Sequence, residues 1–151
     1  MIKLIATLSL FCLTQTHLFG MDLEYVRANY DKAVTDKKLC RQLIEDLEKA
    51  EKSSLFLAYL GGLQTIWANH VFSPISKLNT FNQGKKNIEK AIASDKDNAE
   101  IRFIRLSVQK NAPSFLGYNS MIKTDKAFLR THRTKITSQV VQNKIDKLLN
   151  R

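Results

Sequence analysis

An unbroken stretch of eighteen uncharged residues, from Leu55 to Phe72, constrains this chain more than any other feature of its sequence. Its length approaches the roughly 20 residues that a membrane-spanning helix needs. Gln64, Asn69 and His70 argue against a span, because amides and an imidazole without partners are costly to bury in lipid. We therefore interpret the stretch as the central helix of a bundle, apolar on most sides because other helices cover it.

The rest of the chain predicts an all-α fold of about six or seven helices. Apolar residues recur at spacings of three and four within 21–52, 82–93, 99–110, 120–131 and 135–149, and no strand-like alternation of convincing length appears. Two helices are expected within 21–52, the second capped by Asp36. The Gly61-Gly62 pair indicates a close approach of helix backbones. Ser73-Pro74 is expected to end the central helix, and residues 75–81 to form a linker with helical turns.

Length and composition predict one globular domain. The 151 residues are 44% hydrophobic, with 5 Gly, 2 Pro and 2 Cys. These values exclude a multidomain enzyme, a low-complexity or collagen-like chain, a disulfide scaffold and a polytopic membrane protein.

The N-terminus is typical of a secretory signal peptide. A positive start that ends at Lys3 precedes the uncharged residues 4–13 and a polar stretch over 14–17. Cleavage after Gly20 would leave residues 21–151 as a single exported domain, periplasmic or secreted. Two alternatives stay open: an uncleaved anchor, because Leu18 is larger than the residue preferred near a cleavage site, and a lipoprotein attached through Cys12.

Cys40 is the sole cysteine of the chain after such cleavage, so no internal disulfide is expected. Its spacing places it with Leu39 and Leu43 on one helix face, which favours a small buried hydrophobic residue. The alternative is a reactive thiol whose pKa is lowered by the neighbouring cations, Lys37, Lys38 and Arg41.

Two segments resemble parts of a tetratricopeptide repeat. Gly84-x3-Ile88-x2-Ala91 and the turn Asp95-Lys96-Asp97-Asn98 resemble the second helix of such a repeat and its exit, and Leu57-x2-Leu60-Gly61 resembles the start of a first helix. Gly61 and Gly84 are 23 residues apart, against about 12 in a standard repeat of about 34 residues. The resemblance implies a bundle or short α-solenoid with paired helices over residues 57–106. The chain as a whole resembles small exported bacterial proteins of uncharacterised function.

No pattern typical of catalysis occurs in the sequence, so we expect a protein that is not an enzyme and uses no cofactor or metal. His70 and His132 lie far apart and lack the spacing of metal ligands. There is no glycine-rich phosphate loop and no serine in a nucleophile elbow.

Six residues are candidates for binding. Trp67 and His70 share a helix face, and Arg102 and Arg105 form a polar stripe able to bind a carboxylate or an acidic peptide. Phe115 and Tyr118, in an uncharged aromatic loop, are candidates for insertion into a partner. Each pair has a structural alternative. His70 beside Trp67 suits a hydrogen-bonded structural histidine, the two arginines suit a solvated stripe, and the aromatic loop suits a plug at the end of the bundle.

The formal net charge is +10, and residues 120–151 alone contribute 8 basic and 2 acidic residues. Such a segment suits an acidic protein, an anionic membrane surface or simple solvation. Nucleic acid is the poorest fit for an exported chain without a recognised motif. We predict an exported, non-catalytic binding or scaffolding module for a protein or peptide. The alternative is a peripheral envelope protein held to anionic lipid by its basic C-terminal helices.

Overall fold

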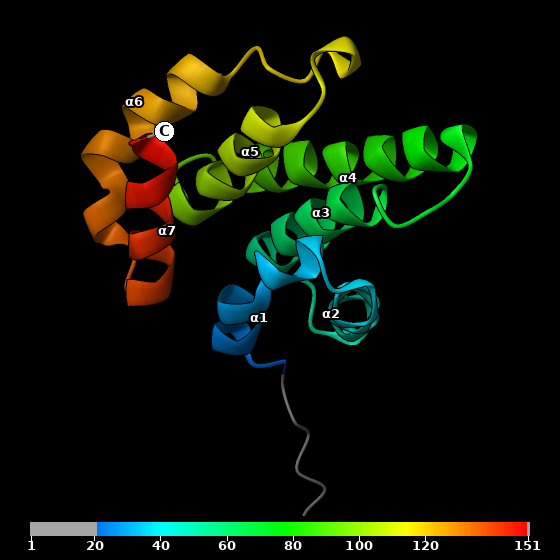
Figure 1. Ribbon diagram of the computed structural model, residues 1–151. Helices are drawn as coiled ribbons and strands as arrows, with labels where there is room; N and C mark the ends of the chain where they lie inside the picture. Colours follow the sequence, from blue (N-terminus) through cyan, green and yellow to red (C-terminus); the bar gives the residue numbers. More distant parts are fainter. Residues whose placement is uncertain (1–20, 151) are drawn as a thin grey trace, which may run out of the picture.

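The computed structural model describes residues 21–150, and the predicted signal peptide lies outside them (Figure 1). The described residues form an all-α fold with seven α-helices and no strand, which confirms the predicted fold class. Three short 3-10 helices, η1 (Lys32–Val34), η2 (Ser114–Leu116) and η3 (Arg133–Lys135), lie between them. The α-helices are α1 (Leu23–Asn29), α2 (Lys37–Lys49), α3 (Ser54–Trp67), α4 (Pro74–Ser94), α5 (Ala99–Asn111), α6 (Ile122–His132) and α7 (Gln139–Leu149).

Polar side chains fix where several helices begin. The Asp36 carboxylate accepts a hydrogen bond from the Leu39 amide at 2.9 Å, which confirms the predicted cap of α2. Ser53 caps α3 in the same way, and Asn98 accepts two amide hydrogen bonds at the start of α5. Each cap satisfies amides that the first turn of a helix leaves without a partner.

The junction between α3 and α4 differs from its prediction. Helix α3 already ends at Trp67, and Pro74 begins α4 instead of ending α3. Proline suits a first helical position, where its missing N–H would have had no partner, and the Ser73 side chain caps the same turn. Residues 75–81, predicted as a linker, belong to α4. Ile75, Leu78 and Phe81 recur at a spacing of three, which is compatible with a helix, but the preceding proline was interpreted as a break.

Helix α3 is the centre of the molecule, as its apolar sequence predicts. It contacts α2, α4, α5 and η1, and its most extensive contact is with α4. A Cβ atom on Gly61 would lie 2.6 Å from the carbonyl oxygen of Gly84, so the two backbones cross where neither residue has a side chain. Gly62 instead makes room for the ring of Tyr30.

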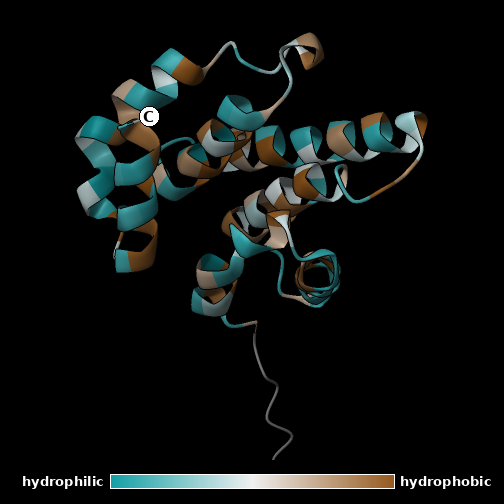
Figure 2. Ribbon diagram, in the orientation of Figure 1, coloured by the Kyte–Doolittle hydropathy of each residue, from teal (hydrophilic) through white to brown (hydrophobic). Residues whose placement is uncertain are grey.

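The remaining helices surround this pair. Figure 1 shows α6 and α7 together at one end of the molecule and α1 and α2 beside α3. The coloured ribbon of Figure 2 shows apolar and polar residues alternating around most of the helices. One continuous core joins them, with Val26, Leu43, Ile88, Leu129 and Ile145 all fully buried. No helix of residues 21–150 is both long and apolar enough to cross a membrane.

Cys40 belongs to this core. Its side chain is fully buried, and its Sγ donates to the carbonyl of Leu63 at 3.6 Å. Burial, with a smaller effect of Asp36, raises the pKa of the thiol to about 12. The neighbouring cations therefore do not activate it, and the interpretation as a small hydrophobic residue is the correct one.

Candidate binding cleft

Arg102 and Arg105 do not form the open polar stripe that the sequence predicts. Arg105 is 3% exposed and donates to both carboxylate oxygens of Asp125, through Nε at 2.7 Å and Nη2 at 2.8 Å. Its Nη1 donates to Glu89 at 3.0 Å. Burial alone lowers the pKa of Arg105, but the hydrogen bonds and charges of Asp125 and Glu89 outweigh it and the pKa is raised. Arg105 thus joins α4, α5 and α6.

Arg102 strengthens the same contact. Its Nη1 donates to Asp125 at 3.1 Å, and its Nε and Nη2 donate to the carbonyl of Lys96. The guanidinium lies 4.3 Å from the ring centre of Phe128. Both arginines therefore act as structural links to α6, because their partner carboxylate is fully buried.

Tyr118 is buried as well. Its hydroxyl donates to Glu89 at 2.6 Å, and its ring packs edge-on against Phe81. Burial and then the Glu89 bond raise the pKa of this hydroxyl. Tyr118 plugs the bundle, as the structural alternative proposed, whereas Phe115 of the same loop is 85% exposed.

Trp67 and His70 do lie side by side, with ring centres 5.6 Å apart. Their other contacts are internal: the Arg41 guanidinium lies 4.9 Å from the Trp67 ring, and His70 Nε2 lies 2.9 Å from the carbonyl oxygen of Ala33. His70 is therefore a hydrogen-bonded structural histidine. The six candidate residues do not form one site, since only Phe115 borders the cleft described below.

A second buried network was missed by the sequence analysis. Glu100 is 4% exposed and accepts from Arg27 Nε at 2.7 Å, from Arg27 Nη2 at 2.6 Å and from the Tyr59 hydroxyl at 2.6 Å. Glu100 raises the pKa of Arg27, and burial followed by Glu100 raises that of Tyr59. This network joins α1, α3 and α5. Its members are too far apart in sequence for any local pattern to indicate it.

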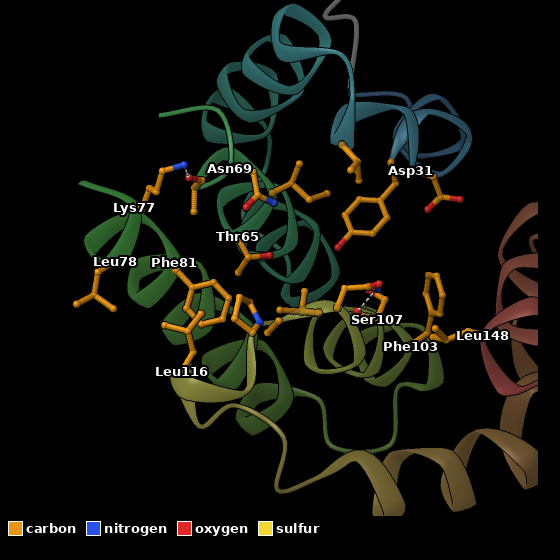
Figure 3. A pocket seen from close by; sticks show the side chains of 18 of the residues that line it. Asp31, Thr65, Asn69, Lys77, Leu78, Phe81, Phe103, Ser107, Leu116 and Leu148 are labelled. Atoms are coloured by element: carbon orange, nitrogen blue, oxygen red, sulfur yellow. Dashed lines mark hydrogen bonds between the residues drawn. The ribbon is translucent and has the colours of Figure 1, made fainter. Parts of the chain in front are cut away.

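A cleft of about 820 Å³ opens between α3 and α4 on one side and α5 and η2 on the other (Figure 3). Residues of η1 and α7 also border it. Most of its lining is apolar, and Ile66, Phe81, Phe103, Val108 and Leu116 contribute. The volume lies in the range of sites that hold ligands in proteins, roughly 300–1,000 Å³.

Two polar side chains inside the cleft, Thr65 and Ser107, already have partners within the protein. The Thr65 hydroxyl donates to the Gly62 carbonyl at 2.7 Å, and the Ser107 hydroxyl donates to the Ile104 carbonyl at 2.8 Å. Tyr30 is buried, and burial raises the pKa of its hydroxyl, which stays protonated. The interior of the cleft is thus uncharged and offers chiefly apolar contact. Within residues 21–150 there is no cluster of three His, Cys, Asp or Glu side chains suited to a metal ion.

The rim of the cleft is apolar and basic. Val34, Leu78 and Phe115 are large apolar side chains exposed at its edge. Lys77 lies at the α4 end, and Lys144 and Lys147 belong to α7 at the other end. Figure 3 shows Lys77 and Leu78 at one side of the cleft, and Phe103 and Leu148, next to α7, at the opposite side.

Of the six candidate residues, only Phe115 belongs to this cleft, and Leu116 of the same aromatic loop, which the sequence also indicates for insertion into a partner, lines it as well. Its walls come from segments as distant in sequence as η1 and α7, which no local pattern brings together.

No family model, curated protein or solved structure matches the chain, so the resemblance to tetratricopeptide repeats stays a prediction.

Proposed function

We propose that the protein is a non-catalytic binding module whose cleft holds an apolar segment of a partner polypeptide. The observation that carries this proposal is the open apolar cleft of about 820 Å³ with Leu78 and Phe115 exposed at its rim. Exposed apolar side chains around a concave apolar surface mark interaction sites, because covering them removes apolar area from water.

The extent of the cleft favours a polypeptide as the occupant. It follows α5 from Phe103 to Asn111, about 12 Å along a helix axis. The exposed rim residues extend the apolar surface beyond the cleft itself. A helix with an apolar face, or an extended segment, can fill the cleft and cover its exposed rim at the same time.

The resemblance to tetratricopeptide repeats supports the same function. It makes α3 the first helix of one pair and α5 the first helix of the next, and both line the cleft. Solenoid repeats present such helices on a concave binding surface. The proposal keeps the predicted export to the periplasm or the exterior, with residues 1–20 as signal peptide.

The test compares two exposed phenylalanines. A phage-displayed library of random dodecapeptides is selected on the purified protein, and the peptides obtained are measured by fluorescence anisotropy against Phe115→Ser and Phe72→Ser. Phe115 borders the cleft, whereas Phe72, which is fully exposed, does not. Since burying a Phe side chain contributes about 1.5–3 kcal/mol, we expect Phe115→Ser to weaken binding roughly ten- to hundredfold.

Phe72→Ser should leave the affinity of the same peptides unchanged. Failure to select any peptide, or peptides that respond equally to both variants, would refute the proposed function. Both substitutions replace exposed side chains, so neither should disturb folding.

The alternative, attachment to an anionic membrane by the basic C-terminal helices, is less well supported. Arg133 and Lys144 pair with Asp146 and Asp31, which neutralises part of the charge there. Salt-sensitive cosedimentation with phosphatidylglycerol vesicles, lost on Lys123→Gln with Arg130→Gln, would favour it. Point variants are used because deletion of the C-terminal helix would remove Val141 and other core residues of α7.

A further inference from the structure

The two ends of the cleft carry positive charge, and its interior carries none. Lys77 borders the end formed by α4, and Lys144 and Lys147 border the end formed by α7. Among the lining residues of the described chain, Asp31 is the only carboxylate, and Lys144 pairs with it. We infer that the cleft selects polypeptide segments in which an apolar centre is flanked on both sides by acidic residues. This inference rests on the proposed function and adds the chemistry of the partner.

Lys77 supplies the charge at the first end. Its ammonium group is 3.4 Å from the carbonyl oxygen of Ala68, the residue that follows α3. A carbonyl does not neutralise the cation, and no ion pair of Lys77 occurs within residues 21–150. A carboxylate arriving from a ligand would meet an ammonium group on a half-buried side chain at the end of α3.

Lys147 supplies the charge at the second end. It is exposed, lies next to the cleft residue Leu148 and has no ion pair in the described chain. Lys144, three residues earlier, is engaged by Asp31 and fixes the position of α7 against the end of α1. One lysine at each end is therefore available for a ligand carboxylate.

Charge complementarity selects this occupant over a segment of the same chain. Residues 1–20 include an apolar run, but their charged side chain is Lys3 and they contain no Asp or Glu. Such a segment would bring like charge to the lysines at the rim, which is unfavourable. A segment with acidic flanks would satisfy both ends of the cleft and its apolar interior together.

The test uses the random dodecapeptide library described above. Peptides that depend on Phe115 are sequenced, and each is also synthesised with Asn and Gln in place of Asp and Glu. We expect acidic residues on both sides of an apolar centre. Lys77→Gln and Lys147→Gln should each weaken the acidic peptides about three- to fivefold, the range of a partly exposed ion pair.

The matched controls separate charge from folding. Lys123→Gln, an exposed lysine of α6 outside the cleft, should change neither peptide form. The amide forms should bind equally to the wild type and to both lysine variants. Raising the salt to about 0.5 M should reduce the difference between acidic and amide forms, because screening weakens exposed ion pairs.

Three results would overturn the inference, and they are distinguishable. Selected peptides that need Phe115 but are neutral or basic leave the proposed function standing and refute the acidic preference. An absence of peptides that need Phe115 refutes both. Dimerisation of the wild type in light scattering, lost in Phe115→Ser, would identify a second copy of the chain as the occupant instead.

Discussion

Replacing Asp125 by Ala tests whether Arg102 and Arg105 are structural residues. Asp125 is fully buried and accepts three hydrogen bonds, two from Arg105 and one from Arg102. Arg102 has a further partner in the Lys96 carbonyl. Arg105 would keep only Glu89, whose side chain is 41% exposed, and would remain a buried cation.

The expected cost follows from that geometry. Removing one partner of a buried ion pair costs about 3–5 kcal/mol, because the remaining charge is left without compensation. This is a large share of the roughly 5–15 kcal/mol that stabilises an ordinary domain. Urea unfolding followed by far-UV circular dichroism should therefore show Asp125→Ala close to the limit of stability. Thermal unfolding should show a melting temperature lower by on the order of 10 °C.

Two further variants make the result specific. Asp146→Ala removes a pair with Arg133 in which both side chains are more than 40% exposed, and it should cost less than about 1 kcal/mol. Asp125→Leu combined with Arg105→Met removes both buried charges and should recover most of the stability lost in Asp125→Ala. Equal costs for Asp125→Ala and Asp146→Ala would refute the structural assignment, as would a double variant no more stable than the single one.

Two other predictions concern single buried side chains. Gln109 is 3% exposed, and neither atom of its amide has a partner in the described chain, so Gln109→Met should stabilise the protein by about 1 kcal/mol in the same urea assay; a loss of stability would contradict this. Cys40, with its pKa raised to about 12, should react with a disulfide reagent at pH 8 only as fast as the chain unfolds. Rapid labelling of the native protein would refute the burial of Cys40. Because the folded thiol keeps its proton at a pH where the unfolded thiol loses it, Cys40 should also make the free energy of unfolding fall as the pH rises above about 9.

The features that the sequence predicted correctly are local ones. Apolar spacing gave the helical class, Asp36 gave a cap, and the uncharged stretch around Gly61 gave the central helix. Each depends on residues within a few turns of one another. Pro74 was interpreted wrongly because proline is compatible both with the end of one helix and with the first turn of the next.

The positions of Arg102 and Arg105 were not predictable for a different reason. Arg102 and Arg105 repeat with a helical period, which is equally typical of a solvated stripe, a binding face and a contact with another helix. The deciding residue is Asp125, which lies 20 positions after Arg105 and has no pattern linking it to α5. The cleft is likewise a product of the tertiary arrangement, since Tyr30, Phe103 and Leu148 meet there from three separate helical segments.

Helix α5 explains how the networks and the cleft depend on each other. Glu100 joins it to α1 and α3, and Arg105 joins it to α4 and α6. Phe103 and Ser107, four residues apart, lie on the side that faces the cleft. Because buried hydrogen-bonded charges hold both other sides, the wall of the cleft is fixed before any ligand arrives. A preformed wall reduces the ordering cost of binding. Substitutions in the networks around Glu100 and Arg105 should therefore lower the affinity of the cleft, although neither residue lines it.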